Sequence, residues 1–234
     1  MLTNNKLKLI KSLQLRKNRL KHKLFVVEGK KIVDEYLKSN YIVDSIYSCM
    51  DWSGEFIKIS DKEMKRISSL KNHCGLLAVV KIPFQKNELI GDTILALEKI
   101  QDPGNFGTMI RLADWFGVST IICSEDCVDL YNPKVIQSSM GSSSRVNVIY
   151  CNLNEKLLEI KNYKKIAMTL DGDNINDFYC DKKKIILLGN EGKGLNGDTI
   201  KLCDYKVGIK KSRKSNAESL NVANACAIAL HCFD

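Results

Sequence analysis

Three short segments of this chain place polar side chains directly after apolar runs. Asn105 and Arg111 follow the run at 94–97, and Glu191 lies in GNEGKGL after IILL. Ser219 and Asn221 lie in ESLNVANACAIAL near the end of the chain. These side chains supply amides, a carboxylate, a hydroxyl and a fixed positive charge, which together can orient a polar substrate and bind an anionic one.

The elements that carry these segments form a regular pattern. From Ile94 onward strands alternate with helices, which indicates a parallel sheet covered on both faces. Ligands of such sheets bind at the carboxyl ends of the strands. All three segments follow predicted strands or lie beside them, so we expect them to meet at that edge. The predicted strands are 94–97, 120–123, 146–150, 165–170, 184–189 and 205–209.

The first segment predicts a helix. Asn105 is suited to cap it, and Gly117 should stop it after Phe116. The periodicity leaves Arg111 on the polar face, where it favours an ordinary surface pair with Asp114, three residues on, over a functional role. Periodicity alone therefore does not assign Arg111 a function.

The second segment contains a competing signal for a dinucleotide. Gly192, Gly194 and Gly197 fit the G-x-G-x-x-G spacing of an NADP-type site. Two features oppose that reading, because the strand already ends at Gly189 and Glu191 would place a carboxylate in the pyrophosphate cradle. A cationic ligand that carries a nucleoside fits this loop better, and S-adenosylmethionine is such a ligand.

In the third segment, Ser219 is expected to cap a terminal helix whose small residues let another backbone approach closely. The same pattern also fits a purely structural packing helix. A lysine-rich stretch, IKKSRKSNA, precedes this segment.

The N-terminal part predicts a smaller α/β unit, and the polar stretch 83–92 is its linker to the rest. Its expected elements are helices at 6–20, 30–38 and 61–70 and strands at 24–27, 43–48, 56–59 and 76–82.

Positive charge is concentrated in two places. The formal net charge is +9, and residues 1–38 hold eleven Lys or Arg against three acidic residues. Such an excess is typical of a protein that binds a polyanion, although a solvated helix face that aids solubility is the alternative. The candidate contacts to such a polyanion are Arg16, Lys17, Arg19, Lys21, Lys23, Lys210, Lys211 and Arg213.

The nine cysteines are scattered, and only Cys123 and Cys127 are close in sequence. They indicate reduced thiols, with neither a disulfide framework nor a metal site. No apolar run has the length of a membrane span, so we expect a cytoplasmic protein without a membrane partner.

The three segments resemble, in order and spacing, the signature motifs of the SpoU/TrmH family of RNA ribose 2′-O-methyltransferases. Asn105 and Arg111 match the family's N-x-G-x-x-x-R pattern, and the segment 132–148 resembles its N-P-K-x-x-x-x-S-x-G-S stretch. The resemblance implies that S-adenosylmethionine is the cofactor. The implied catalytic residues are Asn105, Arg111, Glu191, Ser219 and Asn221, and the implied cofactor-binding residues are Gly189, Ile209 and Leu220.

The resemblance also implies an architecture. It predicts a Rossmann-like domain with a deep trefoil knot at 92–234, preceded at 1–88 by a small α/β/α RNA substrate-binding domain related to ribosomal proteins. It further implies a homodimer formed through the C-terminal domain. Ribosomal RNA is the expected substrate, with transfer RNA or a non-catalytic RNA-binding role as alternatives. The chain departs from the family in the third motif, which lacks its usual Pro, Met and Gly and is two residues longer.

Overall fold

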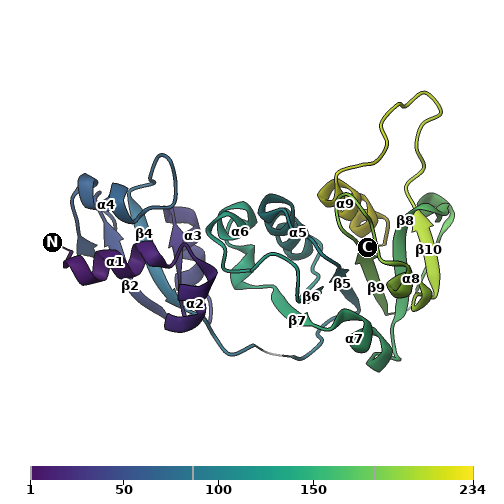
Figure 1. Cartoon of the computed structure of the whole chain (residues 1–234), viewed down its shortest axis with the longest axis horizontal. Coiled ribbons are helices and arrows are strands. Elements are labelled where there is room, and N and C mark those ends of the chain that lie inside the picture. The colour runs from purple at the N-terminus through teal and green to yellow at the C-terminus, as the bar shows by residue number, and fades with distance from the viewer. Residues whose placement is uncertain (1, 86, 182, 234) are drawn as a thin grey trace. The chain divides into compact units, whose positions relative to one another are not determined.

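The computed structural model describes residues 2–85, 87–181 and 183–233 (Figure 1). By its internal contacts the chain forms two units. The first comprises Met1–Gln85 with Asp129–Arg145, and the second comprises Lys86–Val128 with Val146–Asp234. The segment Asp129–Arg145, which the sequence places in the C-terminal domain, therefore packs as part of the first unit.

The first unit contains a four-stranded sheet of order β1-β4-β2-β3. Strand β4 pairs antiparallel with both β1 and β2, and the short β3 pairs parallel with β2. The elements of this unit are α1 (Asn4–Ser12), α2 (Arg16–His22), β1 (Leu24–Glu28), α3 (Lys30–Leu37), β2 (Val43–Ser48), β3 (Ile57–Lys58), α4 (Asp61–Ile67), β4 (Leu76–Lys81) and α6 (Pro133–Ser139), followed by a 3-10 turn at Ser142–Ser144.

Two apolar clusters hold this unit together, one on each face of the sheet. Strand β1 illustrates the alternation, because Val26 joins the cluster beneath α1 and α4 while Phe25 and Val27 join the opposite one. Ile136 of α6 is buried in that second cluster. The Tyr36 hydroxyl also lies 2.9 Å from the Ser143 Oγ, which ties Asp129–Arg145 to α3.

The N-terminal helix predicted at 6–20 is wrong in one respect, because it is two helices. Helix α1 ends at Ser12 and α2 begins at Arg16. The carbonyls exposed by the break are satisfied by side chains: Asn18 Nδ2 donates to Ser12 O at 2.9 Å, and Arg19 Nη1 donates to the carbonyls of Leu13 and Gln14 at 2.8 Å each.

Arg19 therefore does not fit its predicted role as an RNA contact. Its side chain is buried, with 2% exposed, and Nη2 lies 2.5 Å from Asp129 Oδ2. The guanidinium links the helix break to Asp129 and is closed to a phosphate. Arg16, Lys17, Lys21 and Lys23 are exposed, so the remainder of this basic cluster is accessible.

The second unit is a parallel six-stranded sheet of order β10-β8-β9-β5-β6-β7. The predicted parallel sheet and all six predicted strands are present. Its elements are β5 (Thr93–Leu97), α5 (Pro103–Trp115), β6 (Thr120–Ser124), β7 (Asn147–Cys151), α7 (Leu153–Glu159), β8 (Lys164–Asn174), β9 (Lys184–Leu188), α8 (Gly197–Lys201), β10 (Tyr205–Gly208) and α9 (Val222–Phe233), with a 3-10 turn at Ile175–Asp177.

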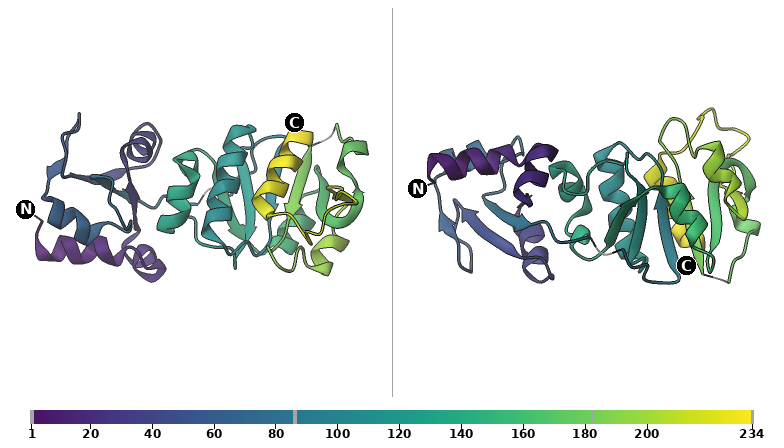
Figure 2. Two further views of the ribbon diagram at one scale, coloured as in Figure 1. Left: turned by 90° about the horizontal axis from the view of Figure 1, so that it is seen from above. Right: turned by 60° about the horizontal axis from the view of Figure 1, so that its bottom comes forward.

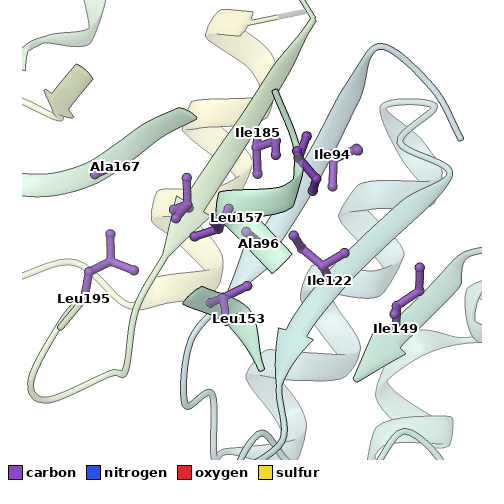
Figure 3. Close-up of a cluster of buried hydrophobic side chains, with 11 residues drawn as sticks. Ile94, Ala96, Ile122, Ile149, Leu153, Leu157, Ala167, Ile185 and Leu195 are labelled. Atoms are coloured by element: carbon purple, nitrogen blue, oxygen red, sulfur yellow. The ribbon is translucent and has the colours of Figure 1, made fainter. Parts of the chain in front are cut away.

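Helices cover both faces of this sheet (Figure 2). On one face Leu153 and Leu157 of α7 pack over Ile94, Ala96 and Ile122, as Figure 3 shows. Helices α5 and α9 contact each other, and α5 and α9 contact β6 and β9, respectively. Residues of the β strands are buried on both faces, which accounts for their continuous apolar sequence.

Strand β8 is longer than the predicted 165–170 and pairs with β10 in two registers. Lys206 lies opposite Ala167, whereas Val207 lies opposite Asp173. The intervening residues leave the ladder at a place where the backbones nearly touch, since a Cβ on Gly172 would lie 2.6 Å from the backbone of Val207. Only glycine permits that approach.

All nine cysteines are free thiols, and Cys123, Cys127 and Cys226 are buried. Burial raises the pKa of Cys226 to about 12, so this thiol stays protonated at neutral pH. No helix in the described ranges is both long and apolar enough to cross a membrane.

Glu63 provides a pH-dependent link within the first unit. Its carboxylate accepts the backbone N–H groups of Ser60 and Leu2, which lowers its pKa from 4.5 to about 2. Because the pKa of this carboxyl is lower in the folded protein than in the unfolded chain, the ionised group stabilises the fold at pH values above its unfolded pKa. That stabilisation is lost as the pH falls toward its folded pKa. We expect Glu63→Ala to lower the Tm at neutral pH, and the difference from wild type to shrink between about pH 4.5 and pH 2. A Tm difference that stays constant over that range would contradict the assignment; Glu159→Ala is the control.

Arg19 should matter for stability and not for RNA affinity. Arg19→Met removes one partner of a largely buried ion pair and leaves Asp129 without its cation. Breaking such a pair lowers the free energy of unfolding by about 3–5 kcal/mol. Urea unfolding monitored by circular dichroism measures this cost, with Lys17→Met on the exposed face of the same helix as the control. Equal stability of the two variants would show that the Asp129 pair contributes nothing.

Candidate active site

The site is set by two strands that lie side by side. Leu97 at the end of β5 is in register with Leu188 at the end of β9, and Glu98 N donates to Leu188 O at 2.9 Å. The segments that follow, 98–105 and 189–195, therefore start from adjacent points on the carboxyl edge of the sheet. This places the first two polar segments together, as predicted.

Asp102, and not Asn105, caps helix α5. Asp102 Oδ1 accepts the Asn105 backbone N–H at 2.8 Å, and Pro103 occupies the first turn. The prediction that Asn105 is the cap is thus wrong, and the reason matters. Because the Asn105 side chain is not needed by its own helix, it is available to other segments.

A continuous hydrogen-bonded chain joins the three segments. Asn221 Nδ2 donates to Asn105 Oδ1 at 2.9 Å, and Asn105 Nδ2 donates to Glu191 Oε1 at 3.3 Å. The same Glu191 oxygen accepts the backbone N–H of Asp102 at 3.2 Å. Three of the five predicted catalytic residues, far apart in sequence, are therefore in direct contact.

Helix α9 fixes the direction of the hydrogen bonds at one end of this hydrogen-bonded chain. Asn221 Oδ1 accepts the backbone N–H of Ala223 at 2.9 Å, so its Nδ2 must face Asn105. Asn221 is thus the cap of the terminal helix, a role the sequence predicted for Ser219. Ser219 is exposed in the preceding loop, and the structure does not bring its hydroxyl to the other four residues.

The loop that carries Glu191 is held by its own backbone and by Asn190. Asn190 and Gly194 exchange two backbone hydrogen bonds, at 3.0 and 2.8 Å. Asn190 Oδ1 accepts from Gly192 N and its Nδ2 donates to Lys99 O at 2.9 Å, which fastens the loop to the segment after β5. These hydrogen bonds hold the loop in place without a ligand.

Asn190, Asp102 and Glu98 were missed by the sequence reasoning. Glu98 is buried and accepts from Asn196 N at 2.6 Å and Thr199 Oγ1 at 2.7 Å, so it holds the chain that leaves the Glu191 loop. The available signal was the position of Glu98 and Asp102 after a buried strand, with Asp102 immediately before a proline at a helix start.

Arg111 is not part of the hydrogen-bonded chain that joins Asn221, Asn105 and Glu191. It is exposed on α5 and forms no ion pair with any described residue, so the surface pair with Asp114 considered from the sequence is not formed. Its position six residues after Asn105 places the two side chains on different sides of the helix. Arg111 is therefore a fixed cation available to a ligand.

The three residues predicted to hold the cofactor all follow or precede elements at the same sheet edge. Gly189 follows β9, Ile209 follows β10, and Leu220 precedes α9 with 49% of its surface exposed. A Cβ at Gly189 would lie 2.1 Å from the Gly194 backbone, so glycine is required there. Backbone groups beside a partly exposed apolar side chain suit the adenosine part of S-adenosylmethionine.

The lysine-rich stretch forms a long loop between β10 and α9. Figure 1 shows it extending from the end of β10 and returning to the start of α9. Lys210, Lys211 and Arg213 are all exposed on it, as their predicted contact with RNA requires.

Three possible metal ligands, Cys49, Asp61 and His73, lie in the first unit with their ligand atoms within 4.8 Å of one another. His73 Nδ1 accepts the Gly75 N–H at 3.3 Å, which places the ring proton on Nε2, 2.9 Å from Asp61 Oδ1. That proton occupies the position a metal would need, so the geometry is that of a hydrogen-bonded pair.

Comparison with known proteins gives a consistent assignment. The SpoU rRNA Methylase family matches residues 92–231, and the MRM3-like substrate binding domain matches residues 4–78. A Bacillus subtilis relative named 23S rRNA (guanosine(2553)-2′-O)-methyltransferase is 29% identical, with 97% of this chain and 95% of the relative covered.

Solved structures agree over the whole chain. A TrmH-family protein from Porphyromonas gingivalis is 31% identical with a TM-score of 0.90, covering 100% of this chain and 98% of that one. An AdoMet-bound rRNA methyltransferase from Sinorhizobium meliloti has the same fold, with 24% identity, a TM-score of 0.88 and coverage of 99% and 95%. The family match spans more than half of the sequence and confirms the predicted membership: the chain belongs to the SpoU rRNA methylase family.

Proposed function

We propose that this protein transfers a methyl group from S-adenosylmethionine to a ribose 2′-hydroxyl of ribosomal RNA. The proposal rests on the hydrogen bonds that join Asn221, Asn105 and Glu191 at the carboxyl edge of the parallel sheet, in a protein of the SpoU family. The name of the Bacillus subtilis relative and the match to a substrate-binding domain at 4–78 support ribosomal over transfer RNA.

The chemistry determines what the protein must supply. The ribose oxygen loses its proton as it forms a bond to the methyl carbon, and the carbon–sulfur bond breaks with its electrons going to sulfur. When bound, S-adenosylmethionine supplies an activated methyl group on a sulfonium. The protein must then align oxygen, carbon and sulfur, and such positioning contributes about 7 kcal/mol or more.

The described residues divide that work. Glu191, Asn105 and Asn221 form a preset polar wall that orients the ribose and, through Glu191, carries a negative charge toward a cationic cofactor. Arg111 binds the RNA phosphate and stabilises the developing alkoxide, because a guanidinium remains protonated in proteins. Ser219, which is exposed in the 209–221 loop, is included in the proposal on the family resemblance.

Gly189, Ile209 and Leu220 hold the adenosine. Leu220, partly exposed, gains most from being covered by an adenine ring. We include in the proposal a deep trefoil knot within residues 92–234, for which the close backbone approaches at Gly172 and Gly189 are the supporting observation. The proposal also comprises a homodimer formed through this domain and a cytoplasmic location.

Arg111→Ala tests the catalytic assignment. Because Arg111 is exposed and unpaired among the described residues, its removal should leave Tm unchanged while lowering kcat for methyl transfer about 100-fold or more. Transfer of radiolabelled methyl groups to total RNA from cells lacking the gene measures this, and mass spectrometry of RNA fragments identifies the product. Lys201→Ala, an exposed cation of the same unit, is the control. Wild-type activity in Arg111→Ala, or no transfer by the wild type, would refute the assignment.

The 209–221 loop should contribute phosphate contacts. Replacing Lys210, Lys211 and Arg213 with alanine removes three charges, so the slope of log affinity against log salt should fall by about 2. Binding of single-stranded ribosomal RNA fragments at several salt concentrations measures the slope. A variant in which Lys161, Lys183 and Lys201 are replaced with alanine has the same net charge and is the control. An equal slope in both variants would show that the loop acts only through the net charge of the protein and does not contact phosphates.

The basic residues of α2 and its C-terminus form an independent test of RNA binding by the first unit. Replacing Arg16, Lys17, Lys21 and Lys23 with alanine should weaken RNA affinity and flatten its salt dependence, while Arg19 is left in place to preserve the fold. Unchanged affinity in this variant would assign those residues to solubility alone.

A further inference from the structure

Strand β2 of the first unit has an open edge. One edge of β2 pairs with β4 from Val43 to Ser48, whereas β3 covers the other edge only at Tyr47 and Ser48. Among the residues that the structure describes, no strand lies beside this second edge between Val43 and Ile46. An open edge presents backbone donors and acceptors to another chain.

This edge forms one wall of a cavity of about 800 Å³. Helix α3 contributes the second wall through Leu37, and the segment 52–57 contributes the third. The rings of Trp52 and Phe56 pack edge to face there with centroids 6.3 Å apart. Leu37 and Ile57 are 44% and 40% exposed at its rim, so the groove offers apolar surface beside the open edge.

The charge of the groove is opposite to that of the whole protein. Its lining contains Asp34, Asp44 and Glu55 against one cation, Lys38, although the chain as a whole has a net charge of +9. None of the three carboxylates forms an ion pair with a described residue. The groove therefore repels a phosphate backbone and attracts a cation.

We propose that this groove binds an extended, basic segment of another protein, which adds to the sheet as a strand beside β2. Main-chain hydrogen bonds to Val43–Ile46 supply affinity in this recognition mode, and alternate side chains supply specificity. Basic side chains pair with Asp44 and Glu55, and the intervening apolar ones contact Trp52 and Phe56. A second copy of this chain is disfavoured, since pairing the two edges would bring like-charged Asp44 residues together.

The experiment uses the full chain and a synthetic probe. A capped seven-residue peptide of alternating lysine and valine is titrated into the Trp115→Phe variant, in which Trp52 is the remaining tryptophan. We expect a saturable change in tryptophan fluorescence. Two ligand controls dissect the binding: the same peptide methylated on alternate backbone nitrogens cannot pair as a strand, and a glutamate–valine peptide reverses the charge. Both should bind at least about tenfold more weakly.

Protein variants separate the groove from the net charge. The double variant Asp44→Lys with Glu55→Lys should bind the lysine–valine peptide at least tenfold more weakly. The double variant Glu125→Lys with Glu159→Lys changes the net charge equally and should bind it as the parent does. The proposal is overturned if fluorescence does not saturate, if the methylated peptide binds equally well, or if both double variants behave alike. A saturable change in Trp52 fluorescence on titration with oligouridine alone would assign the groove to RNA, and concentration-dependent dimerisation that the lysine–valine peptide reverses would assign it to a second copy; either result overturns the proposal.

Discussion

The parallel pairing of β5 with β9 is the constraint on which the site depends. In the sheet order β10-β8-β9-β5-β6-β7, the chain passes from β5 toward β6 and β7 on one side, while β8, β9 and β10 lie on the other. The connections after β5 and β9 therefore diverge from adjacent strand ends, which is the position where ligands of such sheets bind. Asn105 and Glu191 follow these two strands and meet because Leu97 and Leu188 are in register.

The third segment is coupled to this position through a helix cap. The carbonyl of the Asn221 side chain is committed to the first turn of α9, and this leaves only its amide nitrogen for Asn105. Formation of the terminal helix thus sets the direction of every hydrogen bond along the chain to Glu191. The helix cap and the site therefore share one side chain, and a change in the first turn of α9 would also change the direction of the Asn221–Asn105 hydrogen bond.

Much of this architecture could be predicted from the sequence, because apolar runs alternating with helices have few arrangements other than a covered parallel sheet. The details that failed depend on contacts that local sequence does not contain. Asn105 and Ser219 are good caps by type, but Asp102 and Asn221 lie at the residues where the helices begin. Arg19 resembles its exposed neighbours until Asp129, 110 residues away, is brought beside it.

The site keeps the hydrogen-bonded side chains of Asn221, Asn105 and Glu191 apart from the cation of Arg111. The amide–carboxylate chain is hydrogen-bonded throughout, so it loses little conformational entropy when a ligand binds. Arg111 is exposed and unpaired among the described residues. A guanidinium held against Glu191 in the free protein would neutralise that carboxylate. Because Arg111 stays outside the hydrogen-bonded chain, one small site presents a negative and a positive charge separately, as the proposed binding of a cationic cofactor and an RNA phosphate requires.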